Sequence, residues 1–177
     1  MKLAAHQINF APWLPFFAKM HQADIFVLMI HCQFEKNGYQ NRCQVNGKWW
    51  TKPVKSGKEL IKDKQYVDGQ KLYDVNIHWI MAIAKTLGID TGKIHLDFET
   101  QKTGTDRIIE ICKRYNANQY LTNMEATEKY LDESAMIKEG IELVPFEFPY
   151  KIHTFEAFEQ FGIEGTIKLL EKSKCRV

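Results

Sequence analysis

The sequence lacks both a long hydrophobic run and an excess of charge of either sign. Its longest strongly apolar run, Ile25 to Ile30, is far too short to cross a bilayer. The 24 basic and 22 acidic residues give a formal net charge of +2, so composition indicates neither a nucleic-acid partner nor an anionic membrane surface. One lysine and a mixed stretch with His6 and Gln7 begin the chain, and this start is unlike a signal peptide. We therefore expect a cytoplasmic protein without a membrane span.

Cysteine is scarce, and its spacing suggests no pairing. The four cysteines, Cys32, Cys43, Cys112 and Cys175, form neither a Cys-x-x-Cys pair nor a zinc-ligand spacing. Because no export signal is apparent, we expect free thiols in a reducing compartment. Cys112 lies in the apolar stripe of an expected helix, where a thiol acts as a small hydrophobic side chain.

The best-known catalytic and nucleotide-binding signatures are also absent. The sequence contains no Gly-x-x-x-x-Gly-Lys-Ser/Thr loop and no Gly-x-Gly-x-x-Gly fingerprint. It contains no His-Glu-x-x-His and no Gly-x-Ser-x-Gly either. These absences argue against the familiar phosphate-loop, dinucleotide, zinc-protease and serine-hydrolase classes, and they leave the cofactor unassigned.

What the sequence does have is an alternation of strand-like and helix-like segments. Short β-branched or aromatic runs favour strands, and apolar residues three and four apart favour helices. We expect strands over 3–5, 25–29, 94–98, 119–122 and 141–148, and helices over 12–22, 72–87, 105–115, 126–131, 134–139 and 154–172. This order predicts a single three-layer α/β domain, 1–177, with a mostly parallel sheet and an antiparallel hairpin around Asn46-Gly47.

Three local features refine this prediction. Asn46-Gly47 favours a two-residue hairpin turn, because both residues tolerate the positive φ that such a turn requires. The charge-rich stretch from Lys55 to Asp68 predicts an exposed linker with a short helix. Pro145 predicts that 141–148, the last expected strand, lies at a sheet edge.

Polar side chains follow three of the expected strands at their carboxyl ends, where ligands bind in open parallel sheets. They are His6, Gln7 and Asn9 after the first strand, His31 and Gln33 after the second, and Thr122, Asn123 and Glu125 after a later one. If the first two strands are neighbours, His6 and His31 converge on one cleft. A histidine there is a candidate general base, because its ordinary pKa lies near neutrality.

Simpler interpretations remain open for these residues. His6 and Gln7 could serve only to tie down a turn by bonding backbone groups. A metal bound by His6 and His31 lacks a third obvious ligand, so no metal site is predicted. Arg42, beside Asn41, has a guanidinium fork suited to phosphate or carboxylate, but a lone surface arginine more often forms only a salt bridge.

Trp49 and Trp50 are adjacent on an expected strand, so their side chains face opposite ways. We expect one of them in the core. The other is either a platform for a sugar or base ring, or it packs beneath the charge-rich segment.

Several stretches resemble the WbqC-like protein family: "HQINFAPWLPFFAKMHQADIFVL", "QFEKNGYQNRCQV", "WWTKPV" and "LGIDTGKIHLDFETQKTGTDRIIEICKRYNANQYLTNMEATEKYLDE". The family pattern has a hydrophobic strand, Gln-Pro-x-Phe-x-Pro-Trp, and Ala-Asp before a second strand. It continues with Gln-Phe, Asn-Arg and a Trp-x-x-x-Pro-Val strand. Its second half has Leu-Gly-Ile, a helix opened by Thr-x-Arg, and Tyr-Leu-Ser-Gly ahead of Tyr-Leu-Asp. The resemblance covers residues 1–54 and continues from about 75 to 133.

Members of this family are typically encoded among genes for bacterial surface polysaccharides. That setting implies transfer of an acyl or aminoacyl group to a nucleotide-linked amino sugar, with His6 or His31 as the base. Such a protein takes small-molecule substrates, the amino sugar and an acyl donor, and its oligomeric state stays open. The positions on the family pattern are Gln7, Asn9, Phe10, Pro12, Trp13, Asp24, Gln33, Asn41, Arg42, Trp50, Pro53, Arg107 and Tyr120. The expected substrate-binding residues are Gln7, Asn9, Trp13, Gln33, Asn41, Arg42, Trp50, Arg107 and Asn123.

The chain also departs from the family pattern. Acidic residues usually end the family's second strand, where this chain has Ile30 and His31, and Tyr-Leu-Ser-Gly becomes Tyr-Leu-Thr-Asn at 120–123. A central family segment is missing between Lys55 and Tyr73. Loss of the acidic pair favours an alternative, a non-catalytic sugar-nucleotide binding module. A second alternative is a nucleotidylyltransferase of the HIGH type, which shares the strand, His-containing turn and helix, although this chain lacks a second histidine one helical turn on.

Overall fold

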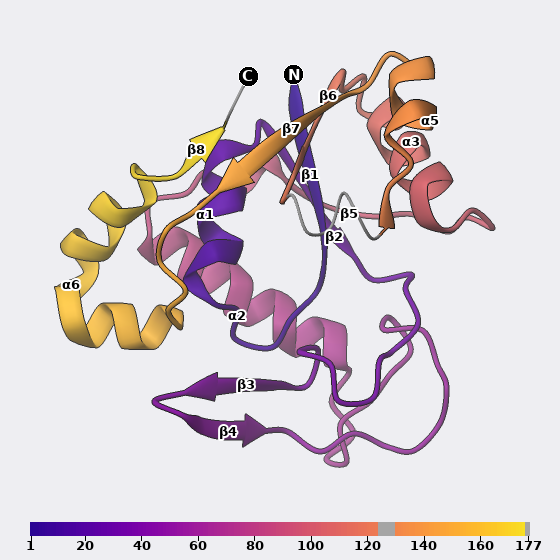
Figure 1. The fold of residues 1–177 in the computed structure, drawn as a ribbon. Coiled ribbons are helices and arrows are strands. Elements are labelled where there is room, and N and C mark those ends of the chain that lie inside the picture. The colour runs from indigo at the N-terminus through magenta and orange to yellow at the C-terminus, as the bar shows by residue number, and fades with distance from the viewer. Residues whose placement is uncertain (124–129, 176–177) are drawn as a thin grey trace.

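The computed structural model describes residues 1–123 and 130–175, and a six-stranded sheet forms its centre (Figure 1). The strands are β1 (Lys2–Gln7), β2 (Ile25–Met29), β5 (Ile94–Leu96), β6 (Gln119–Thr122), β7 (Glu142–Glu147) and β8 (Lys174–Cys175). Their order across the sheet is β5-β2-β1-β6-β7-β8, and every neighbouring pair is parallel except β7 with β8. The predicted α/β fold with a mostly parallel sheet is confirmed.

Helices cover both faces of this sheet (Figure 1). One face carries α1 (Leu14–Gln22), α2 (Leu72–Thr86) and α6 (Thr154–Leu170), and the other carries α3 (Gly104–Arg114) and α5 (Glu133–Lys138). The alternation of β1 supplies both cores, because Ala4 packs with the first set of helices while Leu3 and Ala5 pack with the second. A short 3-10 turn, η1 (Thr91–Lys93), leads into β5. No helix of the described ranges is long and apolar enough to cross a membrane.

The predicted hairpin is present as a separate two-stranded sheet of β3 (Arg42–Val45) and β4 (Lys48–Thr51). Its turn residues, Asn46 and Gly47, have φ of 48° and 72°, as the sequence predicted. The turn is held against α6, because Glu156 accepts a hydrogen bond from the Asn46 backbone N–H and the Glu159 carboxylate lies 3.3 Å from Asn46 Nδ2.

The expectation that one tryptophan of β4 is in the core was wrong. Trp49 is 47% exposed and Trp50 is 50% exposed. All four residues of β4 are exposed, because the hairpin forms a separate two-stranded sheet outside the six-stranded one.

The expectation of an exposed linker with a short helix over 55–68 was wrong in part, since residues 55–59, 63, 67 and 68 are exposed but others are buried. The segment contains no helix, and Lys64 and Tyr66 within it are fully buried. Lys64 Nζ donates to Glu59 Oε2 at 2.7 Å and to the Gly57 carbonyl at 2.8 Å. The high charge of the segment therefore reflects internal pairing as well as contact with solvent.

A buried amide links this segment to the rest of the fold. Asn76 of α2 is completely buried and accepts a hydrogen bond from Tyr66 Oη at 2.9 Å. Its Nδ2 donates to the Gln40 carbonyl at 2.7 Å and to the Ile8 carbonyl at 3.4 Å. One side chain thus connects α2 with three irregular segments.

The prediction of a final edge strand was wrong in part. β7 pairs with β6 along Gln119–Thr122, and β8, which was not expected, pairs with it at Phe146 and Glu147. Pro145 directly precedes those two positions, so β8 covers only the end of β7. The expected helix over 126–131 and the candidate residue Glu125 lie outside the described residues, except for the end of that helix at 130 and 131.

Candidate functional site

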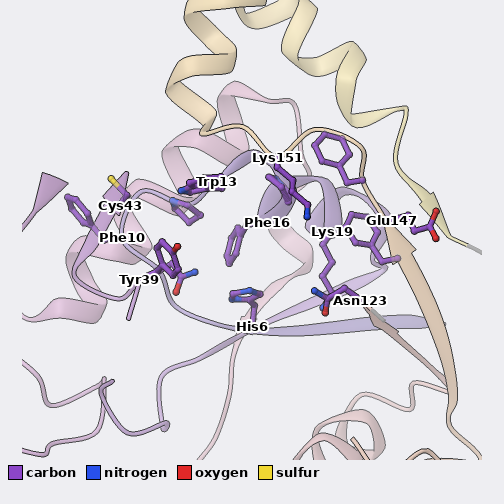
Figure 2. Close-up of a pocket in the computed structure, with 15 residues that line it drawn as sticks. His6, Phe10, Trp13, Phe16, Lys19, Tyr39, Cys43, Asn123, Glu147 and Lys151 are labelled. Carbon is purple, nitrogen blue, oxygen red and sulfur yellow. The ribbon is translucent and has the colours of Figure 1, made fainter. Parts of the chain in front are cut away.

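A cavity lies at the switch point of the sheet, where the chain connections run in opposite directions on the two sides of β1 and β6. β1 has β2 on one side and β6 on the other, and the helices following these strands cover opposite faces of the sheet. Ligands of open α/β sheets bind at such switch points, beyond the carboxyl ends of the strands. Here the cavity has a volume of about 750 Å³, within the usual range for small-molecule sites. Its lining residues are His6, Asn9, Phe10, Pro12, Trp13, Pro15, Phe16, Lys19, Tyr39, Cys43, Asn123, Phe146, Glu147, Phe148 and Lys151 (Figure 2).

His6 lines this cavity between Tyr39 and Lys19 (Figure 2). It lies in β1, since the strand extends two residues beyond the expected end, and its ring packs edge-on against Phe16 at a centroid distance of 4.9 Å. His6 Nδ1 is 2.8 Å from the Gln7 carbonyl oxygen. A carbonyl can only accept, so Nδ1 carries the hydrogen and Nε2 keeps a lone pair.

The surroundings of His6 keep its imidazole uncharged. Burial and, to a smaller extent, the positive charge of Lys19 together lower the pKa of His6 from 6.5 to about 4, against the opposing effect of the hydrogen bond to Gln7. At neutral pH this side chain is therefore a neutral hydrogen-bond acceptor and a potential proton acceptor.

Lys19 is a second basic group at the cavity, and the sequence analysis did not identify it. Burial lowers the pKa of Lys19 from 10.5 to about 8, and no residue of the described ranges gives it an ion pair or a hydrogen bond. Its ammonium lies 5.7 Å from the centre of the Tyr120 ring. The available signal was its position as the one charge among Phe16, Phe17, Ala18 and Met20 on α1.

Aromatic side chains line the other part of the cavity. In Figure 2, Phe10 and Tyr39 lie on one side of His6, and Lys19 and Asn123 lie on the other. The Phe10 N–H donates to the Tyr39 carbonyl at 2.9 Å, which fixes the two segments together. Trp13 Nε1 is buried and has no hydrogen-bond partner within the described part of the chain. An acceptor atom on a ligand would satisfy this donor.

His31 does not line this cavity. Asp97, directly after β5, accepts hydrogen bonds from the Ile30 N–H at 2.8 Å, the His31 N–H at 3.2 Å and His31 Nδ1 at 3.0 Å. Arg107 of α3 forms an ion pair with the same carboxylate and donates to the His31 carbonyl at 3.2 Å. The predicted site residues His31 and Arg107 thus belong to a cluster on the α3 side, and Asp97, which holds it together, was not identified from the sequence.

The remaining predicted site residues lie elsewhere. Gln7 follows His6 in the strand and so points to the opposite face, where its Oε1 accepts from Gln40 Nε2 at 2.6 Å. Gln33 is exposed and its backbone pairs with Leu60. Asn41 is buried and donates to the Lys52 carbonyl at 3.1 Å, beside the hairpin.

Arg42 and Trp50 are hairpin residues outside the cavity lining. The Arg42 guanidinium lies over the Trp49 ring at 4.3 Å and donates to the Asn37 carbonyl. Trp50 packs on Phe155 at a centroid distance of 6.3 Å. Of the residues predicted from the sequence, the cavity therefore brings together His6, Asn9, Trp13 and Asn123.

The described residues show no cluster of three or more side chains able to hold a metal ion. All four cysteines are free, and burial raises the pKa of Cys32 and Cys43 to about 11. A thiol with such a raised pKa is a poor nucleophile at neutral pH. Cys43 therefore contributes a small apolar surface to the cavity.

Comparison with known proteins identifies one family. A model described as the WbqC-like protein family matches residues 7–71 and 65–161. The two matches overlap over residues 65–71, inside the segment where the sequence analysis expected part of the family pattern to be missing. No curated protein and no solved structure matches the chain.

Proposed function

The chain belongs to the WbqC-like protein family, and on this basis we propose that it transfers an acyl or aminoacyl group to the amino group of a nucleotide-linked amino sugar. The product would serve the synthesis of a bacterial surface polysaccharide. The observation that carries the proposal is the neutral imidazole of His6, with the Nε2 lone pair available, in a cavity at the switch point of the sheet.

His6 is uncharged at neutral pH, so its Nε2 lone pair can accept a proton. An amine that attacks an acyl carbonyl forms a carbon–nitrogen bond and must lose a proton. His6 Nε2 accepts that proton, the bond between the acyl carbon and its leaving group breaks, and the proton passes to the leaving group. The Nδ1 hydrogen bond to the Gln7 carbonyl keeps the ring in the required tautomer and orientation.

Other cavity residues support binding of the two reactants. The carboxamides of Asn9 and Asn123 line the cavity and can donate hydrogen bonds to a sugar hydroxyl or to the developing acyl oxyanion. Phe10, Trp13 and Tyr39 provide flat apolar surfaces for a sugar or nucleobase ring. The cavity thus combines a base, amide donors and a ring-binding wall.

The test is a search for turnover with matched histidine variants. The purified protein is incubated with UDP- and dTDP-amino sugars and activated acyl donors, and acyl transfer is followed as a gain in product mass. We expect His6→Gln, which retains a donor for the Gln7 carbonyl, to lower kcat/KM by about 100-fold or more. His78→Gln, on an exposed part of α2, is the control and should retain activity.

The same experiment separates this proposal from other histidine roles and other functions. Loss of turnover in His31→Gln with normal turnover in His6→Gln would assign the base to the Asp97 cluster. Release of pyrophosphate from a nucleoside triphosphate with magnesium would indicate a nucleotidylyltransferase. A rise in Tm with a sugar nucleotide, without turnover of any donor, would indicate a binding module.

A further inference from the structure

The cavity has two chemically different halves. Phe10, Trp13 and Tyr39 form the aromatic half, and Lys19 with Lys151 gives the other half its positive charge (Figure 2). His6 lies between these halves. A ligand that fills the whole cavity must therefore present a ring to one half and an anionic group to the other.

Of the two lysines, Lys19 gives the stronger indication of an anionic ligand. Its side chain is largely buried, it lines the cavity, and no carboxylate among the described residues pairs with it. Removing an ammonium from water without a counterion is unfavourable. The nearest favourable contact is the Tyr120 ring, whose centre lies 5.7 Å away, and that is weaker than an ion pair. A negative group of a ligand would supply the missing partner.

Lys151 adds a second cation from a different element, the segment between β7 and α6. Glu147 also lines the cavity, but in Figure 2 its carboxylate points outward, away from His6. Two lysines from separate elements suit a group with more than one negative charge, and lysine is a common binder of phosphate.

Building on the proposed function, we propose that Lys19 and Lys151 bind a pyrophosphate group of the substrate or of the donor, while the ring of that ligand lies on the aromatic half. Because His6 lies between the two halves, this placement brings the middle of the ligand to the base. The pyrophosphate can belong to a nucleoside-diphosphate sugar or to a coenzyme A thioester. Both carry the same anionic chemistry next to an aromatic base.

Calorimetric titration of the protein distinguishes these sources and tests the proposal. The probes are UDP, dTDP and coenzyme A, with uridine, thymidine and adenosine as partners that lack phosphate. We expect at least one phosphorylated probe to bind 10-fold or more tightly than its nucleoside. Tighter binding of UDP or dTDP would assign the pyrophosphate to the sugar nucleotide, and tighter binding of coenzyme A would assign it to the donor.

Charge-removing variants then test the two lysines. Lys19→Met should abolish the preference for the phosphorylated probe, so that it and its nucleoside bind within 2-fold of each other. Lys151→Met should reduce that preference by a smaller factor, because Lys151 is exposed. Lys85→Met, which removes an exposed lysine near the end of α2, is the control and should bind like the wild type. The Tm of each variant establishes that it is folded.

The outcomes separate this proposal from the proposed function. A wild-type preference in Lys19→Met, or equal binding of phosphorylated and unphosphorylated probes by the wild type, would overturn the pyrophosphate site even if acyl transfer is found. Absence of binding for all probes would overturn it as well. A preference that depends on Lys19, in a protein without transferase turnover, would support the site and refute the transfer reaction.

Discussion

The Lys19 ammonium lies beside an uncharged imidazole, and neither basic side chain has an acidic partner in the described part of the cavity. Burial disfavours the charged form of each. Lys19 nevertheless stays mostly charged at neutral pH, because its pKa of about 8 is still above 7, whereas His6 does not. The cavity therefore contains a cation whose burial lowers the stability of the fold.

Removal of this cation should stabilise the unliganded protein. The pKa of Lys19 falls from 10.5 in the unfolded chain to about 8, and one pKa unit corresponds to about 1.4 kcal/mol. We expect Lys19→Met to raise the free energy of unfolding at pH 7 by up to about 3 kcal/mol, measured by urea denaturation. The same variant should lose the phosphate preference, so stability and binding would change in opposite directions.

The pH dependence gives a second check on Lys19. Between pH 8 and 10.5 the unfolded chain binds more protons than the folded chain at this residue, so the stability of the wild type should rise with pH in that window. Lys19→Met should lack this rise, while Lys85→Met should show it. A parallel rise in Lys19→Met and the wild type would mean that Lys19 is not buried in its charged form.

At the scale of elements, Asp97 connects parts of the fold that are distant in sequence. Its carboxylate follows β5, accepts the N–H groups of Ile30 and His31 after β2, and pairs with Arg107 of α3. The side chain of Asp97 is fully buried and that of Arg107 is 10% exposed. The cluster thus joins two neighbouring strand ends to a helix on one face of the sheet.

Neutralising Asp97 should destabilise the protein strongly. Asp97→Asn leaves the Arg107 guanidinium buried without its counterion, and breaking a buried pair from one side costs about 3–5 kcal/mol. Urea unfolding at pH 7 measures this loss. Asp63→Asn is the matched control, because Asp63 pairs with Lys62 at 3.3 Å on the surface and is 53% exposed. Equal, small effects of the two substitutions would show that the Asp97 cluster contributes little to stability.

At the scale of the whole molecule, the helices and strands could be predicted from periodicity, whereas side-chain contacts between distant segments could not. The parallel sheet, the hairpin at Asn46-Gly47 and the placement of His6 at a cavity follow from local patterns and the strand-end rule. His31 was expected beside His6, because nothing in the sequence near it reveals that Asp97 binds it. Lys19 was overlooked since its burial depends on how α1 packs beside β1, which periodicity alone does not specify.

The segment 55–68 was expected to be an exposed linker with a short helix, and Asn76 explains how this polar stretch becomes part of the packed fold. Its amide connects α2 with Tyr66, with the Gln40 carbonyl and with the Ile8 carbonyl after β1. Tyr66, Gln40 and Ile8 are all buried. Each of these groups therefore depends on Asn76 for a hydrogen bond that water cannot replace.

Substitution of Asn76 should therefore weaken several segments together. Asn76→Leu keeps the approximate volume but leaves Tyr66 Oη and two carbonyls without their partner, at a cost of about 1–3 kcal/mol for a buried unsatisfied group. Tyr66→Phe removes only the hydroxyl that bonds Asn76. In the double variant the hydroxyl is no longer stranded, so its loss of unfolding free energy should be smaller than the sum of the single losses by about 1 kcal/mol. Losses that add within about 0.3 kcal/mol would show that Tyr66 and Asn76 stabilise the fold independently.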